Sequence, residues 1–146
     1  MTHTQRPKRD PSRPLRTDHD LLEHARFVSQ GVASPRRQLW LTMIDSYDVP
    51  LPVLIPIEDI DAAPDDVFVK NVFQVISTFL PDAGGGGSVT FLLERLGSET
   101  ISADDCAWDA ALRAQGQAVG VPVRAVFLSV RGVVRLLTAD DAAAAS

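Results

Sequence analysis

The alternation of apolar and polar residues divides most of the chain into short helices and strands. Apolar residues first recur at helical spacing between Leu21 and Val28. Thr17 or Asp18 can cap the start of such a helix, and Gly31 is a typical stop signal. The pattern therefore predicts a first helix from about residue 18 to residue 30.

A hairpin is predicted next. Residues 38–45 alternate between two apolar faces, and residues 51–57 return after a short polar turn. The second arm carries Pro50, Pro52 and Pro56, which all lack an N–H donor on the same side of the strand. Such a strand can lie only at an unpaired edge, so we expect residues 51–57 at the edge of the sheet.

The remaining helices and strands are predicted from the same two patterns, helical spacing and alternation of apolar residues. A second helix is predicted from about residue 64 to residue 80, with one apolar face. That face contains Val69, Val72, Phe73, Ile76 and Leu80. A third helix is expected to bury Trp108, Ala111, Leu112 and Val119 and to end at Gly120. The other elements are a buried strand at residues 88–94, this helix at residues 102–119, and a closing hairpin at residues 121–130 and 133–138.

This order predicts an α/β fold in a single compact domain. The expected sheet is mixed, with an N-terminal hairpin, two central helices and a C-terminal hairpin, in two or three layers around one contiguous core. We place the domain at residues 18–139, after a disordered basic arm at residues 1–17 and before a flexible tail at residues 140–146. The length of 146 residues suits one domain.

Composition excludes several classes of protein. One cysteine cannot form an internal disulfide, so the chain is not a disulfide scaffold. The apolar run at residues 49–57 is nine residues long and contains three prolines, whereas a membrane-spanning helix needs about 20 apolar residues. No apolar segment of a signal peptide follows the N-terminal charges. We therefore expect a cytoplasmic protein that does not enter a membrane.

Charge is unevenly distributed along the chain. Residues 1–37 hold eight Lys/Arg and four Asp/Glu, a net +4, and residues 38–146 hold six and fifteen, a net −9. The acidic body would repel nucleic acid. A disordered leader explains the basic segment, and an electrostatic arm is the alternative. The arm would consist of Arg6, Lys8, Arg9, Arg13 and Arg16.

Few residue types in the predicted domain support catalysis. His3, His19 and His24 all lie in the first 24 residues, and we expect them to be solvated rather than part of the domain body. A zinc site or a Ser-His-Asp relay built on histidine is therefore not expected. Cys106 lacks a neighbouring base and is interpreted as a packing residue. The glycines at residues 84–87 follow a helix and precede a strand, which is the reverse of a phosphate-binding loop.

Acidic residues gather around the end of the strand at residues 88–94. They are Glu94, Glu99, Asp104, Asp105 and Asp109. Carboxylates can bind a hard cation, but acidic residues also favour the first turn of a helix. Ser102 and Asp105 have the spacing of a capping box, in which each side chain bonds the backbone of the other residue. Ser102 is therefore expected to cap the helix at residues 102–119.

Here the sequence resembles the JAB/MPN domain, specifically its RadC-like branch. The strand at residues 88–93 is followed by Glu94-Arg95-Leu96-Gly97 and then by Ser102, Ala103, Asp104 and Asp105. Leu112, Gly116, Gly120 and Val121 fall where the RadC-like pattern has a leucine, two glycines and an apolar residue. The resemblance covers residues 38–138 in element order and spacing. In that family His-x-His-Pro after the strand and the Asp of Ser-x-x-Asp bind zinc, and an upstream Glu activates the metal-bound water.

The chain departs from the family at these zinc ligands. Glu94 and Leu96 stand where the two histidines would be, Gly97 stands where the proline would be, and the following loop is shorter. Leucine cannot bind zinc, and catalytic zinc requires three protein ligands. A deaminase-like fold has a similar element order, but its Cys-x-x-Cys and its His/Cys-x-Glu are missing from this sequence.

These observations predict a non-catalytic JAB/RadC-like domain that needs no cofactor and binds a protein partner. One alternative is a metal-binding protein or hydrolase that uses Glu94 and Asp105, the two candidate ligands at the altered site. Another is a nucleic-acid accessory protein that acts through the basic arm.

Overall fold

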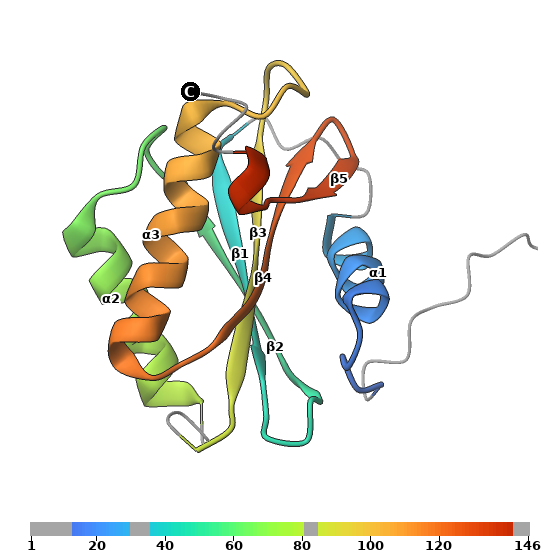
Figure 1. Ribbon diagram of the computed structural model, residues 1–146, viewed down its shortest axis with the longest axis vertical. Helices are drawn as coiled ribbons and strands as arrows, with labels where there is room; N and C mark the ends of the chain where they lie inside the picture. Colours follow the sequence, from blue (N-terminus) through green and yellow to red (C-terminus); the bar gives the residue numbers. More distant parts are fainter. Residues whose placement is uncertain (1–12, 30–35, 81–84, 142–146) are drawn as a thin grey trace, which may run out of the picture.

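A five-stranded mixed sheet runs through the middle of the protein (Figure 1). The computed structural model describes residues 13–29, 36–80 and 85–141. In chain order the elements are α1 (Asp18–Ser29), β1 (Gln38–Ile44), β2 (Pro50–Glu58), α2 (Asp66–Phe79), β3 (Ser88–Arg95), α3 (Ala103–Val119), β4 (Val123–Val130) and β5 (Val133–Leu136). The fold is therefore the expected single α/β domain, with a hairpin at each end of the sheet and two helices between them.

The strands lie in the order β2-β1-β3-β4-β5. Only β3 and β4 are parallel, and the other neighbours are antiparallel. The prediction that residues 51–57 form an edge strand is confirmed, because in the sheet formed by the described residues β2 pairs only with β1. Between Thr42 and Ile44 of β1, the partner strand advances from Leu54 to Pro50, so β2 carries extra residues and bulges there.

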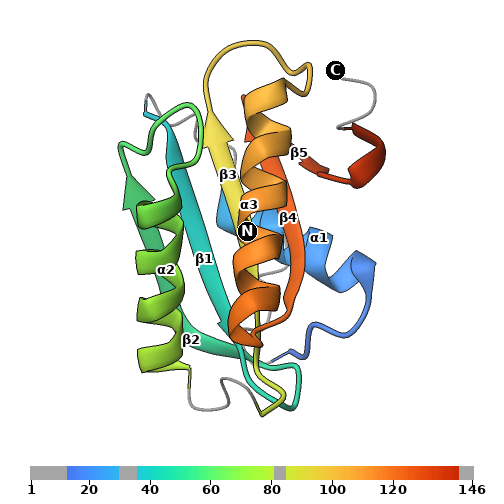
Figure 2. The same ribbon diagram turned by 60° about the vertical axis from the view of Figure 1, so that its left-hand side comes forward.

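Helices α2 and α3 cover one face of the sheet (Figure 2). The predicted apolar face of α2 is confirmed: Val69, Val72, Phe73 and Ile76 are buried, as is Leu80 at the C-cap. Their core extends to β1, β3 and β4 and includes the fully buried Trp108 and Leu112 of α3. The predicted burial of Val119 is wrong, because its side chain is 42% exposed at the last turn of α3.

Helix α1 covers the opposite face, where it contacts mainly β3, β4 and β5. Thr17 caps it: the Asp20 N–H donates to Thr17 Oγ1, and Asp20 Oδ2 accepts from the Thr17 N–H. A second apolar cluster forms beneath α1, with Leu21 and Ala25 packed near Leu92 and Phe127 of the sheet. The molecule thus has three layers and two cores separated by the sheet, which corrects the expectation of one contiguous core.

The first described residues differ from the expected arm. Leu15 is fully buried, and its N–H donates to the carbonyl of Asp48 at 2.6 Å. Residues 13–17 therefore belong to the packed domain rather than to an arm. Residues 1–12 and 142–146, including Arg6, Lys8 and Arg9, lie outside the described residues, as does the predicted stop at Gly31.

Candidate functional site

Two of the sequence-predicted site residues, Glu94 and Asp105, make their contacts at the carboxyl end of β3, on opposite faces of the sheet. Glu94 and Arg95 are the last two residues of this central strand. Successive side chains of a strand point to opposite faces. Glu94 therefore lies on the α1 face with Gln38 and Trp40, and Arg95 lies on the α3 face with Asp105.

Arg95 forms a buried ion pair with Asp105. Its Nε donates to Asp105 Oδ1 at 2.8 Å and its Nη2 to Asp105 Oδ2 at 2.7 Å, with the two side chains 7% and 0% exposed. The remaining guanidinium hydrogens are donated to the carbonyls of Leu96, Ser98 and Thr100. Every Arg95 donor is thus satisfied, and the loop after β3 is closed around this side chain.

The predicted capping box at α3 is confirmed. Ser102 Oγ accepts from the Asp105 N–H at 3.1 Å, and Asp105 Oδ2 accepts from the Ser102 N–H at 2.9 Å. Burial alone would raise the pKa of Asp105, but hydrogen bonds from Arg95 and the Ser102 backbone outweigh it, so this pKa lies below its ordinary value. Asp105 is therefore held as a carboxylate by a cation and a helix terminus.

Glu94 is bound differently. It is 6% exposed, and its Oε1 accepts from Gln38 Nε2 at 2.6 Å and from Trp40 Nε1 at 2.5 Å. Ser129 is its partner across the β3–β4 ladder, and the Ser129 hydroxyl lies 2.9 Å from that of Ser29 on α1. A row of buried polar groups thus crosses the α1 face, and the two donors to Glu94 are uncharged.

This geometry contradicts the alternative that Glu94 and Asp105 hold one metal ion, because the sheet separates them. The other acidic residues do not join either of them: Glu99 and Asp104 are exposed, and Asp109 accepts from Arg113 Nε at 2.8 Å. The described residues contain no group of three or more His, Cys, Asp or Glu that could hold a metal.

The interpretation of His24 as a solvated residue is wrong. Because α1 packs on the sheet, His24 is 8% exposed, and its Nε2 lies 2.9 Å from Thr42 Oγ1 of β1. Cys106 is only half-buried, so the interpretation as a packing residue holds in part. Burial, and then the negative charges of Asp141, Asp105 and Asp109, raise the pKa of its thiol, which opposes a nucleophilic role.

The base of the predicted electrostatic arm is anchored to α1. Arg13 Nη2 lies 3.4 Å from Asp20 Oδ1, and the Arg16 N–H donates to Asp20 Oδ2 at 3.1 Å. Hydrogen bonds from the backbone of Thr17 and Arg16 lower the pKa of Asp20 below its ordinary value. The charge of Arg13 is thereby partly balanced on the domain itself.

Two surface hollows were missed by the sequence interpretation. An apolar groove of about 160 Å³ lies between α1 and β2, and a cavity of about 340 Å³ lies between α1, α3 and β4. One sequence signal could have indicated the groove: β2 is an edge strand, yet apolar residues such as Leu54 and Ile55 occupy both of its faces. An edge strand with two apolar faces indicates a second surface available for contact.

The fold and these networks define a three-layer α/β domain whose central strand ends in satisfied polar contacts. Comparison of the chain with protein-family models gave no match, and comparison with curated proteins gave none either. Among the described residues, no helix is both long and apolar enough to cross a membrane.

Proposed function

We propose that this protein is a non-catalytic binding domain that recognises another protein through the apolar groove between α1 and β2. The observation that carries the proposal is this groove, which exposes large apolar side chains beside a hollow of about 160 Å³. A cytoplasmic location and remote descent from the RadC-like branch of the JAB/MPN domains are parts of the same proposal.

The groove results from incomplete cover of the sheet. Helix α1 lies mainly over β3, β4 and β5, so no helix of the described residues covers β2 on this face. His24, Phe27 and Val28 form one wall, and residues 50–54 form the other. The bulge in β2 falls within this second wall, between Pro50 and Leu54.

The exposed walls suit an apolar anchor from a partner. Phe27 is 41% exposed, Val53 50% and Leu54 39%. A few large apolar side chains that enter pockets contribute most of the binding energy in protein interfaces. The hollow is large enough for one such side chain, for example Leu or Phe, and the surrounding apolar surface would exclude water from it.

The prolines of β2 restrict the form of the partner. Pro50, Pro52 and Pro56 cannot donate backbone hydrogen bonds, so a partner strand cannot extend the sheet along this edge. We therefore infer that the partner inserts a side chain, from a helix or a loop, rather than adding a strand.

The proposal assigns no catalytic role to the end of β3, because its polar side chains are hydrogen-bonded to other residues of the protein. Arg95 and Asp105 satisfy one another, and Glu94 accepts from two side chains. In the proposed descent, Ser102 and Asp105 keep the family spacing as a capping box, and Arg95 is the partner of Asp105. The nucleic-acid alternative stays a prediction, because Arg6, Lys8 and Arg9 lie outside the described residues.

Selection from a library of random peptides displayed on phage would test the proposal. We expect selected peptides to share one large apolar residue and to bind the purified protein. The Leu54→Gln variant should weaken that binding by about tenfold, because burial of a leucine side chain contributes about 1.5–3 kcal/mol. Amide resonances of α1 and β2 should shift when the peptide binds.

The matched control is Val67→Gln, which removes an exposed apolar side chain from α2 on the other face. It should leave peptide affinity unchanged. The proposal fails if no peptide is selected, or if selected peptides bind the Leu54→Gln variant as tightly as the original protein. Sedimentation addresses a further outcome: a dimer that Leu54→Gln dissociates would show that a second copy fills the groove, and would overturn recognition of another protein.

A further inference from the structure

The second hollow lies where the sheet lacks an outer strand. Within the described residues, strand β5 pairs with β4 over Phe127–Val130, the Leu137 N–H donates to the Val126 carbonyl, and the chain then leaves the sheet at Thr138. Beside the first half of β4 this leaves a cavity of about 340 Å³ between the start of α1 and the side of α3. This volume lies in the lower part of the range that small-molecule sites occupy, about 300–1,000 Å³.

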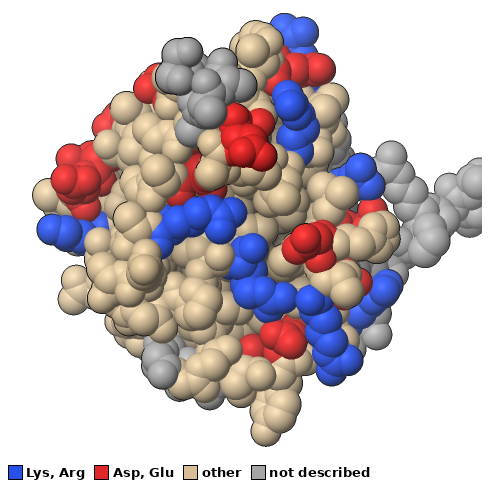
Figure 3. All heavy atoms as spheres, viewed as in Figure 1, with Lys and Arg blue, Asp and Glu red and all other residues tan. Residues whose placement is uncertain are grey.

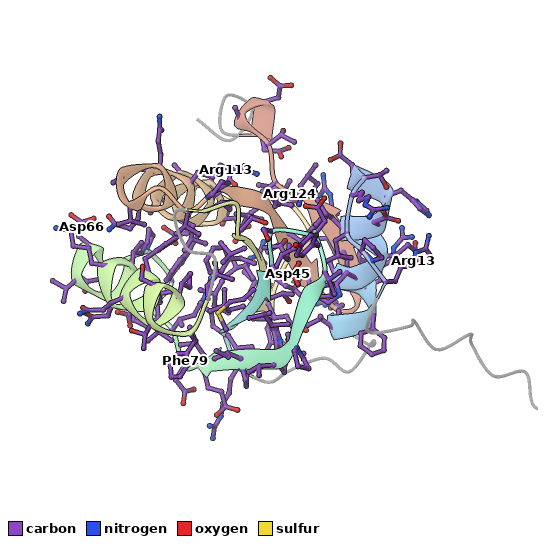
Figure 4. All side chains as sticks on the ribbon, turned by 90° about the horizontal axis from the view of Figure 1, so that it is seen from below. Arg13, Asp45, Asp66, Phe79, Arg113 and Arg124 are labelled. Atoms are coloured by element: carbon purple, nitrogen blue, oxygen red, sulfur yellow. The ribbon has the colours of Figure 1, made fainter. Side chains whose placement is uncertain are left out.

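Charged groups of both signs line this cavity. Arg113 reaches it from α3 and Arg124 from β4, and Figure 4 shows the two close together. Asp18 and Asp109 supply two negative charges. Figure 3 shows the corresponding face, with a broken band of Lys and Arg side chains and acidic side chains on both sides of it. The lining is therefore balanced in charge, which disfavours a polyanion such as a nucleotide.

Each arginine is held in place on one side only. Arg113 donates from Nε to Asp109 and from Nη1 to the Val123 carbonyl at 3.4 Å, and its Nη2 makes no hydrogen bond to the described residues. Arg124 donates from Nη1 to Asp48 at 3.0 Å and from Nη2 to the carbonyls of Leu15 at 2.9 Å and Arg16 at 3.4 Å, so both Nη2 hydrogens are used. Its Nε and the second Nη1 hydrogen make no hydrogen bond to the described residues. These positioned guanidinium groups retain donors suited to a carboxylate.

Asp18 and the apolar lining complete the chemistry. Asp18 lines the cavity and is exposed, and its side chain makes no hydrogen bond or ion pair to the described residues, so this carboxylate is available to an ammonium group. The apolar part of the lining includes Leu21 and Phe127, each 2% exposed, and Leu137, 1% exposed. These residues are distinct from those of the apolar groove, which uses the later part of α1.

We propose that this cavity binds a small zwitterion of the α-amino-acid type with an apolar side chain. Arg113 and Arg124 bind its carboxylate, Asp18 binds its ammonium group, and the apolar lining accommodates its side chain. The proposal is independent of the protein-binding function assigned to the groove.

Titration of the full chain with L-leucine, followed through its amide NMR resonances, tests the proposal. Resonances of Ala125, Phe127 and Leu137 should shift at millimolar ligand. N-acetyl-L-leucine lacks the ammonium charge and L-leucinamide lacks the carboxylate. Each should bind about tenfold more weakly, as expected when one charged hydrogen-bonding group is lost.

Two variants assign the charges to residues. Asp18→Asn should weaken L-leucine binding about tenfold, and because Asp18 is exposed the substitution should leave the fold intact. Arg113→Gln should also weaken L-leucine binding about tenfold. Its matched control is Arg26→Gln, which should leave L-leucine binding unchanged. Arg26 pairs with Glu23 on α1 and does not line the cavity.

Three results would overturn the proposal. The first is the absence of resonance shifts at about 20 mM L-leucine, a concentration far above a millimolar dissociation constant. The second is equal binding of N-acetyl-L-leucine, which would indicate that the cavity binds a plain carboxylate. The third is unchanged L-leucine binding by the Asp18→Asn variant.

Discussion

The two faces of the sheet differ in how completely they are covered. On one face, α2 and α3 lie side by side over a continuous apolar core (Figure 2). On the other face α1 is the one helix among the described residues, and the groove lies beside it. The cavity lies where β4 is left uncovered, between α1 and the side of α3. The first face thus mainly stabilises the fold, and both hollows border the less covered helix α1.

The two faces also differ in how they hold a buried carboxylate at the end of β3. Asp105, on the α3 face, is paired with the guanidinium of Arg95. Glu94, on the α1 face, accepts from the neutral side chains of Gln38 and Trp40. Replacing each carboxylate by its amide should therefore have very different consequences, and the two substitutions form a direct test of the comparison.

The largest effect is expected for Asp105→Asn. This change keeps the side-chain shape but leaves the buried Arg95 without a counter-charge, which should lower the free energy of unfolding by about 3–5 kcal/mol. Denaturant unfolding measures it. Asp104→Asn is the control: Asp104 is exposed in the same helical turn, so its loss should cost less than about 1 kcal/mol. Equal losses in the two variants would contradict the assigned role of the ion pair.

The same variant should change the response to pH. The folded pKa of Asp105 is lowered, so its charge contributes stability that is complete above the unfolded-state pKa of about 3.9 and is lost as pH falls through the folded value. The stability difference between the original protein and Asp105→Asn should consequently shrink below about pH 4. A difference that stays constant from neutral to acid pH would argue against the ionised pair.

A smaller effect is expected for Gly116→Ala on the covered face. A Cβ there would lie 2.6 Å from the Val121 carbonyl oxygen and 2.8 Å from Val123 Cγ2. Alanine normally favours a helix over glycine by about 1 kcal/mol, but this overpacking should reverse the sign and cost about 1–3 kcal/mol. Thermal unfolding gives the sign directly. The exposed helical position Gln117, changed to Ala, serves as control, and a stabilised Gly116→Ala variant would show that α3 packs less tightly than described.

The smallest effect is expected for Glu94→Gln. The amide oxygen can still accept from Gln38 and Trp40, and the change removes a buried charge that has no cationic partner among the residues bonded to it. Stability should therefore stay within about 1 kcal/mol of the original protein. A loss as large as that of Asp105→Asn would mean that Glu94 has a cationic partner, and the contrast between the two faces would not hold.

Much of the fold could be predicted from local patterns. The periods of two and 3.6 residues located every strand and helix, because burial of one face is encoded by neighbouring positions. Capping at Ser102 and the edge position of β2 were also predictable, since a hydroxyl three residues before a carboxylate and three prolines in one strand act locally. The candidate site was less predictable. His24 was placed outside the domain body, because nothing local shows that α1 packs against Thr42.

The sequence by itself determined the elements and their order, and it places every histidine within the first 24 residues. Only the tertiary structure decided which charges meet. Asp48 and Arg124 are 76 residues apart in sequence, and Ser29 and Ser129 are 100 apart, yet both pairs are in hydrogen-bond contact. Tertiary packing also decided three other features. These are the separation of Glu94 from Asp105 by the sheet, the groove beside α1 and the cavity beside β4. Each depends on how distant segments pack, and packing free energy is shared among residues that no local pattern connects.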